Sequence, residues 1–255
     1  STSKVLKVTD DLDEVFVGGY TSGSGMYAIK DEPYPVLKVK DFKRDPQDRI
    51  IIDEATGYPN VATSLRVAGG TNPTDVLGFV SNIRFKGLSL GTTIEYRHGA
   101  YIWNDLGDDL TFTGIGWLSA TNGRQRFVIP NSVTEKTVAG QTVYEPNTDI
   151  VTSKGGVEFW TNIYRQAEYP FVTSADFWKL RELSLTYDVP NSVLPKAIQG
   201  ISVGIVGRNL ITLLPKSNYY TDPEFNYTTG NAVGLTTNAQ TPPTRSFGFT
   251  ASVKF

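Results

Sequence analysis

The sequence predicts an all-β chain built from long antiparallel strands, of the kind that form the wall of a large transmembrane β-barrel. Three observations predict this class. Apolar and polar residues alternate over several segments of roughly 10 to 13 residues, close to the length that a tilted strand needs to cross a bilayer. Tyr, Phe and Trp make up 12% of the residues, a composition that favours strands. Long and short connections alternate between the segments, as extracellular loops and periplasmic turns do in outer-membrane barrels.

Residues 1–74 lack long alternating segments. Short apolar runs such as Val15–Val17 and Ile50–Ile52 stand among many Gly, Pro and Asp residues. We expect an extracellular loop or subdomain here, together with the end of a preceding strand. A group of aspartates could ligate calcium, but it lacks the glycine and the distal glutamate of a calcium loop, so a solvated turn is the better interpretation. The group consists of Asp41, Asp45, Asp48 and Asp53.

Residues 75–103 predict a transmembrane hairpin with a tight turn at Lys86–Gly87. His98 follows Glu95 and Arg97, but no nucleophile motif surrounds it, so catalysis is not expected. In both strands the apolar positions share one face and small or polar positions mostly occupy the other. On the apolar side stand Leu77, Phe79, Ile83, Phe85, Leu88, Leu90, Ile94 and Tyr96, and on the other Gly78, Asn82, Arg84, Ser89, Thr93 and Arg97.

Residues 104–175 are expected to form a long extracellular loop. Asp105, Asp108 and Asp109 could supply a carboxylate pair for glycoside hydrolysis, but that reaction depends on a separation across a cleft that one sequence does not contain. A polar loop is the better interpretation. We expect no helix longer than a short one over residues 191–198.

Residues 176–213 predict two transmembrane strands joined by a short periplasmic turn. Leu183, Leu185 and Tyr187 occupy one phase of the first strand. Lys179 and Arg181 fall on the same phase, which conflicts with lipid contact unless they lie above the hydrocarbon or next to a β-bulge. The second half of the second strand, from about residue 206, has no clean assignment by alternation.

Residues 214–243 are expected to form a further extracellular loop, and residues 244–255 the C-terminal strand. The loop is rich in aromatic side chains, which offer a large contact area to a sugar, a peptide or a partner protein at low entropic cost. Packing within the loop itself is an equally good interpretation. The aromatic candidates for substrate or partner contact are Tyr219, Tyr220, Phe225 and Tyr227.

Composition excludes several classes of function. The net charge is −2, without the basic excess of a nucleic-acid-binding protein. There is no cysteine and only one histidine, so thiolate zinc sites and histidine clusters are absent, and we expect no metal and no cofactor. The sequence contains neither a basic segment followed by an apolar one, as in a signal peptide, nor an apolar run of about 18 residues, as in a transmembrane helix. We therefore expect neither feature in these residues.

Several motifs in one order carry a family resemblance. Asp176–Pro190, Gly207–Leu210, Asp222–Glu224 and Pro242–Phe249 resemble the ending of SusC/RagA-like TonB-dependent transporters. Upstream, Gly69–Thr74 followed by a strand and Phe85–Leu88 resembles the preceding hairpin of the same family. The aspartate-containing turn before Ile50 departs from the Asp- and Gly-rich turn of many relatives, which puts a cation site there in doubt.

The resemblance implies a barrel of about 22 strands with an internal plug, in the bacterial outer membrane. It implies energy supply through TonB, a SusD-like surface lipoprotein as partner, and import of oligosaccharides or oligopeptides. The last strand also resembles the signal that directs barrel assembly in the outer membrane. The residues that carry this signal are Phe247, Phe249, Val253 and Phe255.

Five long strands do not close a barrel, and an open sheet edge in lipid leaves backbone groups unpaired. The remaining strands, the plug and the TonB-contacting segment are therefore expected as partners of these residues, together with the lipid bilayer. The main rival is a secreted, soluble β-sandwich that binds carbohydrate. A β-sandwich glycosidase is a second rival, although we do not expect an enzyme.

Overall fold

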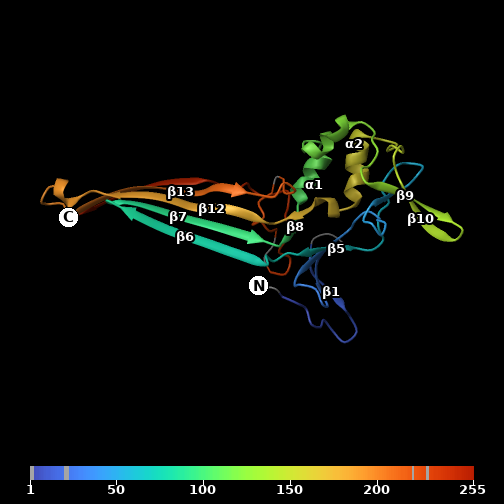
Figure 1. Cartoon of the computed structure of the whole chain (residues 1–255), viewed down its shortest axis with the longest axis horizontal. Coiled ribbons are helices and arrows are strands. Elements are labelled where there is room, and N and C mark those ends of the chain that lie inside the picture. Colours follow the sequence, from blue (N-terminus) through green and yellow to red (C-terminus); the bar gives the residue numbers. More distant parts are fainter. Residues whose placement is uncertain (1–2, 20–22, 220, 228–229) are drawn as a thin grey trace.

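The computed structural model describes residues 3–19, 23–219, 221–227 and 230–255. Its largest element is a long antiparallel sheet with the strand order β14-β13-β12-β7-β6 (Figure 1). The described strands leave this sheet open, with β6 and β14 as its two edges. The five strands are β6 (Asp75–Phe85), β7 (Leu88–His98), β12 (Phe177–Asp188), β13 (Gly200–Leu213) and β14 (Ser246–Lys254).

The register gives this sheet one apolar face and one mainly polar face, as the alternation predicts. Ile83 lies opposite Leu90 in the β6–β7 pair, and Leu90 lies opposite Leu185 in the β7–β12 pair. Leu185 in turn lies opposite Ile205, whose partner on β14 is Phe249. Side chains of this row are exposed, up to 72% for Phe249. The apolar face is therefore uncovered by the rest of the described chain.

A β-bulge at Arg181 explains the two cations that conflict with the apolar phase. The pairing of β12 with β7 and with β13 shifts between Leu180 and Glu182. Since one extra residue reverses the phase of a strand, Trp178 joins the apolar face and stacks on Tyr96 with ring centroids 4.4 Å apart. Lys179 consequently points to the polar face, where it is 3% exposed.

The same shift resolves the second half of β13. Leu180 lies opposite Ile211 and Glu182 opposite Arg208, so Asn209 and Leu210 are extra residues on β13. Asn209 adopts a φ of 53°, a left-handed conformation that Asn tolerates better than most residues. Two extra residues preserve the phase, and Ile211 therefore returns to the apolar face.

The β6–β7 turn is as tight as predicted. Lys86 and Gly87 both have positive φ, 46° and 83°, the conformation of a two-residue hairpin turn that matches the twist of the strands. A Cβ atom on Gly87 would lie 2.6 Å from the carbonyl oxygen of Asp188. This position requires glycine for both its conformation and its close approach.

Residues 104–175, predicted as a long loop, contain short helices and strands. Helix α1 (Asp105–Phe112) begins at Asn104, whose side chain accepts a hydrogen bond from the N–H of Gly107 at 3.0 Å. The helix expected over 191–198 is reduced to the short η5 (Asn191–Val193). The other elements are β8 (Tyr101–Trp103), η1 (Trp117–Arg124), β9 (Ser132–Val138), β10 (Gln141–Pro146), α2 (Gly156–Glu158), η2 (Phe159–Ile163), η3 (Tyr164–Gln166), η4 (Tyr169–Phe171) and β11 (Val172–Ser174).

The N-terminal residues form small sheets. One has the order β1-β2-β3-β5, and β4 (Ile50–Ile52) runs parallel to β9 in a second sheet with β10. Strands β8 and β11 form a two-stranded sheet. The strands of the first sheet are β1 (Glu14–Gly18), β2 (Gly25–Ile29), β3 (Val36–Val39) and β5 (Arg66–Gly70).

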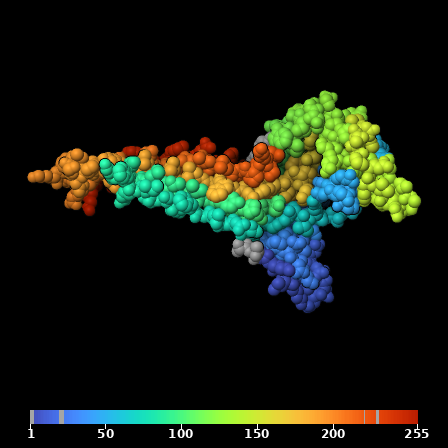
Figure 2. Space-filling model, viewed as in Figure 1, coloured from blue at the N-terminus to red at the C-terminus, as the bar shows by residue number. Residues whose placement is uncertain are grey.

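The hydrophobic core lies beside the long sheet rather than on it. We call the described residues of 3–74, 99–176 and 214–245 the loop body. One buried cluster joins Met26, Leu37, Trp103 and Leu235, and a second includes Phe159. Apart from Phe177, the buried hydrophobic side chains of the described residues lie outside the five long strands. The loop body gathers at one end of the sheet, and the C-terminus lies at the other (Figures 1 and 2).

Within the described ranges, no helix combines the length and the apolar character needed to cross a membrane.

Candidate functional site

A network of charged side chains covers the polar face of the long sheet where the β13–β14 connection folds back over it. Lys179 Nζ lies 2.8 Å from Asp222 Oδ1 and 2.6 Å from Glu224 Oε2. The ammonium group is thus held by two carboxylates from one connection. Because an unpaired buried ammonium is costly, these contacts fix residues 222–224 to β12.

Arg181 extends the network to β7. Its Nη1 donates to Glu224 Oε2 at 2.6 Å, and its Nε donates to Glu95 Oε2 at 2.7 Å. Arg97 donates to the other oxygen of Glu95 at 2.7 Å and lies 3.4 Å from Glu224. Three cations and three carboxylates, counting Asp222, therefore neutralise one another on the polar face.

Glu224, which lies in the β13–β14 connection, has a strongly shifted pKa. Burial raises the pKa of its carboxyl group, but hydrogen bonds and charges from Arg181 and Lys179 outweigh burial and lower that pKa to about 2. Glu224 is consequently ionised throughout the neutral and mildly acidic range. The charge that holds Lys179 and Arg181 is permanent under these conditions.

A polar hollow of about 590 Å³ adjoins the network. Arg245 lines it from the start of β14 and forms no ion pair with a carboxylate of the described residues. The hollow can accommodate polar groups of a ligand on this face of the sheet. Its lining comprises Lys179, Arg181, Asn209, Thr212, Asp222, Glu224, Pro243, Thr244 and Arg245.

The aromatic residues predicted to contact a substrate or partner take different positions in the 214–243 connection. Tyr219 is 41% exposed and meets the Trp117 ring edge to face, with centroids 5.1 Å apart. Phe225 is half-buried, and Tyr227 is 55% exposed while its N–H donates to the carbonyl of Leu235. Tyr220 lies outside the described residues. Tyr219 and Trp117 thus form an aromatic pair, of which the sequence analysis proposed only Tyr219 as a candidate.

His98 connects the end of β7 to the residue that precedes β12. Its Nδ1 lies 2.6 Å from Asp176 Oδ2, and the N–H of Gly99 donates to Asp176 Oδ1 at 2.8 Å. Tyr96 stacks on the imidazole with centroids 6.1 Å apart. These contacts hold the end of β7 beside the start of β12.

Of the three aspartates considered for glycoside hydrolysis, Asp108 and Asp109 are bound by an arginine, whereas Asp105 accepts a hydrogen bond from the N–H of Asn238 at 3.0 Å. Asp108 accepts two hydrogen bonds from Arg165 at 2.7 and 2.9 Å, and Asp109 accepts one at 3.0 Å. Burial raises the pKa of Asp108, and the Arg165 guanidinium opposes that rise. These contacts attach α1 to the segment after η2.

In the turn before β4, Asp41 binds Arg44 at 2.7 Å and Arg66 at 2.8 Å. Asp45 binds Arg49 there. Over the described ranges, no group of three or more His, Cys, Asp or Glu side chains is arranged to hold a metal ion.

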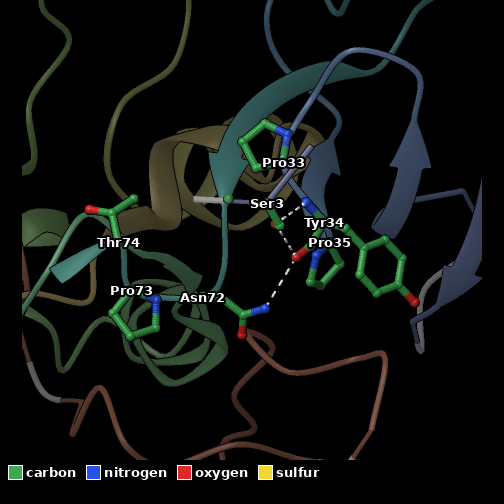
Figure 3. A pocket seen from close by; sticks show the side chains of 8 residues that line it. Ser3, Pro33, Tyr34, Pro35, Asn72, Pro73 and Thr74 are labelled. Atoms are coloured by element: carbon green, nitrogen blue, oxygen red, sulfur yellow. Dashed lines mark hydrogen bonds between the residues drawn. The ribbon is translucent and has the colours of Figure 1, made fainter. Parts of the chain in front are cut away.

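A second hollow, of about 400 Å³, lies between the β2–β3 connection and the approach to β6 (Figure 3). The Asn72 amide donates to the carbonyl of Tyr34, which also accepts from Ser3 Oγ. The remaining lining is mainly proline and glycine. These residues tie the N-terminal sheet to the long sheet and bring no charged group into the hollow.

The residues of the expected assembly signal lie on or beside the edge strand β14. Phe247 and Phe249 occupy its apolar face and are 78% and 72% exposed, and Val253 lies opposite Ile201. Phe255 follows the strand and is 80% exposed. All four side chains are accessible to a partner on the open edge.

No protein-family model and no curated protein matches the chain. Among solved structures it is similar to the RagAB peptide importer in the closed-closed state, with 19% identity and a TM-score of 0.54. It is also similar to the RagAB peptide transporter and to the importer in the open-open state, each with 18% identity and a TM-score of 0.55. Each alignment covers 98% of this chain but only 25% of the other chain. At this identity the similarity establishes a shared fold.

Proposed function

We propose that this chain is the C-terminal part of the barrel of a SusC/RagA-like TonB-dependent transporter in the bacterial outer membrane. The complete barrel has about 22 strands in this proposal, which rests for that number on the family resemblance. The transporter imports oligopeptides or oligosaccharides together with a SusD-like surface lipoprotein. The fold shared with RagAB peptide importers supports the proposal.

The two-faced long sheet is the observation that carries the proposal. Its strands have 9 to 14 residues, long enough to cross a bilayer when tilted. Its apolar face is uncovered, whereas its polar face carries the network around Lys179. In a membrane the first face meets lipid and the second faces the hydrated interior. The loop body then lies at the extracellular end, and the C-terminus at the periplasmic end.

Site-directed spin labelling of the native membrane protein tests this orientation. The chain has no cysteine, so single cysteines can be introduced here in a background freed of any others. We expect labels at Ile83 and Leu185 to collide mainly with oxygen dissolved in lipid. Labels at their neighbours Asn82 and Thr186, on the opposite face, should collide mainly with a water-soluble nickel chelate.

The soluble β-sandwich gives a different result. A second sheet would cover the apolar face, so labels at Ile83 and Leu185 would be shielded from both reagents. The protein would also remain in solution without detergent. Either result would refute the barrel proposal and favour a secreted carbohydrate-binding module.

A further inference from the structure

An apolar hollow of about 410 Å³ lies within the loop body, away from the charged network. Its floor consists of buried side chains from three separate segments. Phe42 is 2% exposed, Phe159 1% and Trp160 5%. Ile129, 7% exposed, completes the floor from the segment before β9. A hollow of this size accommodates one or two bulky side chains of a ligand.

The mouth of the hollow is formed by less buried residues. Thr121 and Phe127 are half-buried, and Asn122 is exposed. The backbone leaves the helical conformation at Thr121, with φ −57° and ψ 151°, and Asn122 has a positive φ of 55°. This change of direction ends the helical part of η1 beside the hollow, which Thr121 and Asn122 line.

The lining favours an apolar ligand group over a sugar. Phe127 and Trp160 are nearly parallel, 16° apart, and Phe159 meets Trp160 edge to face. The lining holds no charged side chain, whereas a sugar ring exposes many hydroxyl groups that lose hydrogen bonds on burial. Burial raises the pKa of Tyr164 to about 12, so its phenol also remains neutral. Aromatic or aliphatic side chains fit this environment best.

The segment that forms the mouth is basic. Arg124 donates to the carbonyl of Gly114 at 2.9 Å, and Arg126 to the carbonyl of Thr152 at 2.6 Å. Lys154 lies on the neighbouring segment, where Gly155 approaches the backbone of Gln125. None of these three cations forms an ion pair with a carboxylate in the ranges that the structure describes. Their charge is therefore available to an anionic ligand.

We infer that this hollow binds a bulky apolar side chain of an acidic oligopeptide, with the arginines of the mouth segment attracting the peptide's carboxylates. The inference rests on the proposed import function and deepens it, because it selects peptides over glycans and names their chemistry. The hollow acts as a capture site on the loop body.

Titration calorimetry on the native complex in detergent tests the inference. The probes are acetyl-Glu-Phe-Glu-amide, the same peptide with Ala in place of Phe, acetyl-Lys-Phe-Lys-amide, and maltohexaose. We expect the first peptide to bind. Replacing Phe by Ala should weaken binding roughly tenfold or more, since the apolar burial is lost. The lysine peptide should bind more weakly, and its deficit should shrink at high salt.

Two variants at one position locate the binding. Thr121→Trp fills the mouth, and we expect it to weaken binding of the phenylalanine peptide at least tenfold. Thr121→Ser keeps the hydroxyl that donates to the carbonyl of Leu118 and should bind like the wild type. Thermal unfolding shows whether each variant is folded. A Thr121→Trp protein that fails to fold is replaced by Thr121→Phe, with the same expectation.

Equal binding of the Phe and Ala peptides, unchanged binding in the folded mouth-filling variant, or binding of maltohexaose alone would overturn the inference. So would the absence of binding by every probe. Each of these outcomes leaves the spin-label test untouched. The capture site can therefore fail while the membrane orientation stands, and the two failures are distinguishable.

Discussion

Neutralising Glu224 should detach the β13–β14 connection from the long sheet. The environment of Glu224 lowers its pKa from 4.5 to about 2. Each pKa unit corresponds to about 1.4 kcal/mol, so its ionised form stabilises the docked connection by about 3 kcal/mol. The side chain is 25% exposed, so solvent screening reduces this stabilisation to about 2 kcal/mol. Glu224→Gln should lose most of it.

Hydrogen exchange of individual amides measures this loss. The N–H of Tyr227 donates to the carbonyl of Leu235 within the connection and reports its local opening. A loss of about 2 kcal/mol accelerates exchange roughly thirtyfold when the exchange rate follows the equilibrium between the closed and the locally open state. Amides in the middle of β12 should change little, because their ladder bonds remain.

A matched control for Glu224→Gln is available on β12. Glu182 accepts a hydrogen bond from Arg208 at 2.9 Å, but the two side chains are 38% and 63% exposed. Such an exposed pair contributes little, so Glu182→Gln should leave the exchange of Tyr227 unchanged. If Glu224→Gln accelerates that exchange less than about threefold, the docking role that we assign to Glu224 is wrong.

The pH dependence follows from the same shift. The folded-state pKa of Glu224 lies below its unfolded value, so its contribution is fully present above about pH 4.5 and is lost as the pH falls toward 2. After correction for intrinsic exchange rates, protection of Tyr227 should be constant from pH 7 to about pH 5 and decrease below pH 4.5. A loss of protection centred near pH 6 would require a different titrating group.

Two further predictions concern the strands. Gly87→Ala should destabilise the β6–β7 hairpin by about 2 kcal/mol, since it forces a left-handed conformation on alanine and brings Cβ against Asp188. The urea midpoint of the detergent-solubilised protein measures this loss of stability. Lys86→Asn is the control, because asparagine tolerates the left-handed conformation of this turn. An unchanged midpoint for Gly87→Ala would contradict the turn geometry. Phe255→Ser should reduce the heat-modifiable, assembled form in the outer-membrane fraction at equal synthesis, whereas Lys254→Ser should not; equal assembly of both would show that the terminal phenylalanine is no assembly signal.

Much of the long sheet could be predicted from alternation, because one exposed face and one polar face leave a period-two pattern in the sequence. The structure also confirms the predicted tight turn at Lys86–Gly87. Alternation was less informative at residues 179–181 and 206–210, where bulges interrupt the period. The two cations on the apolar phase, Lys179 and Arg181, were the sequence signal of the bulge. Their carboxylate partners Asp222 and Glu224 were not predicted, because they lie more than 40 residues further along the chain.

The short helices and strands within the loop body were not predicted. Its helices and strands are short, and short elements carry little periodicity. Asn104 with Asp105 and Asp108 does form a helix start signal, with a capping side chain and acidic residues in the first turn. That signal was interpreted as polar loop. The apolar hollow could not be predicted, because its aromatic lining comes from segments far apart in the sequence.

The distribution of the buried core has a consequence for the order of folding. Met26, Trp103 and Leu235 belong to one cluster, yet hairpin β6–β7 separates the first from the second and strands β12 and β13 separate the second from the third. A contact between two of these residues can form only after the strands between them have returned the chain to the same end of the sheet. Contacts of such large sequence separation form late and slowly. We therefore expect Leu235, in the β13–β14 connection, to join the cluster last, so that the core of the loop body is completed only after β13 has paired.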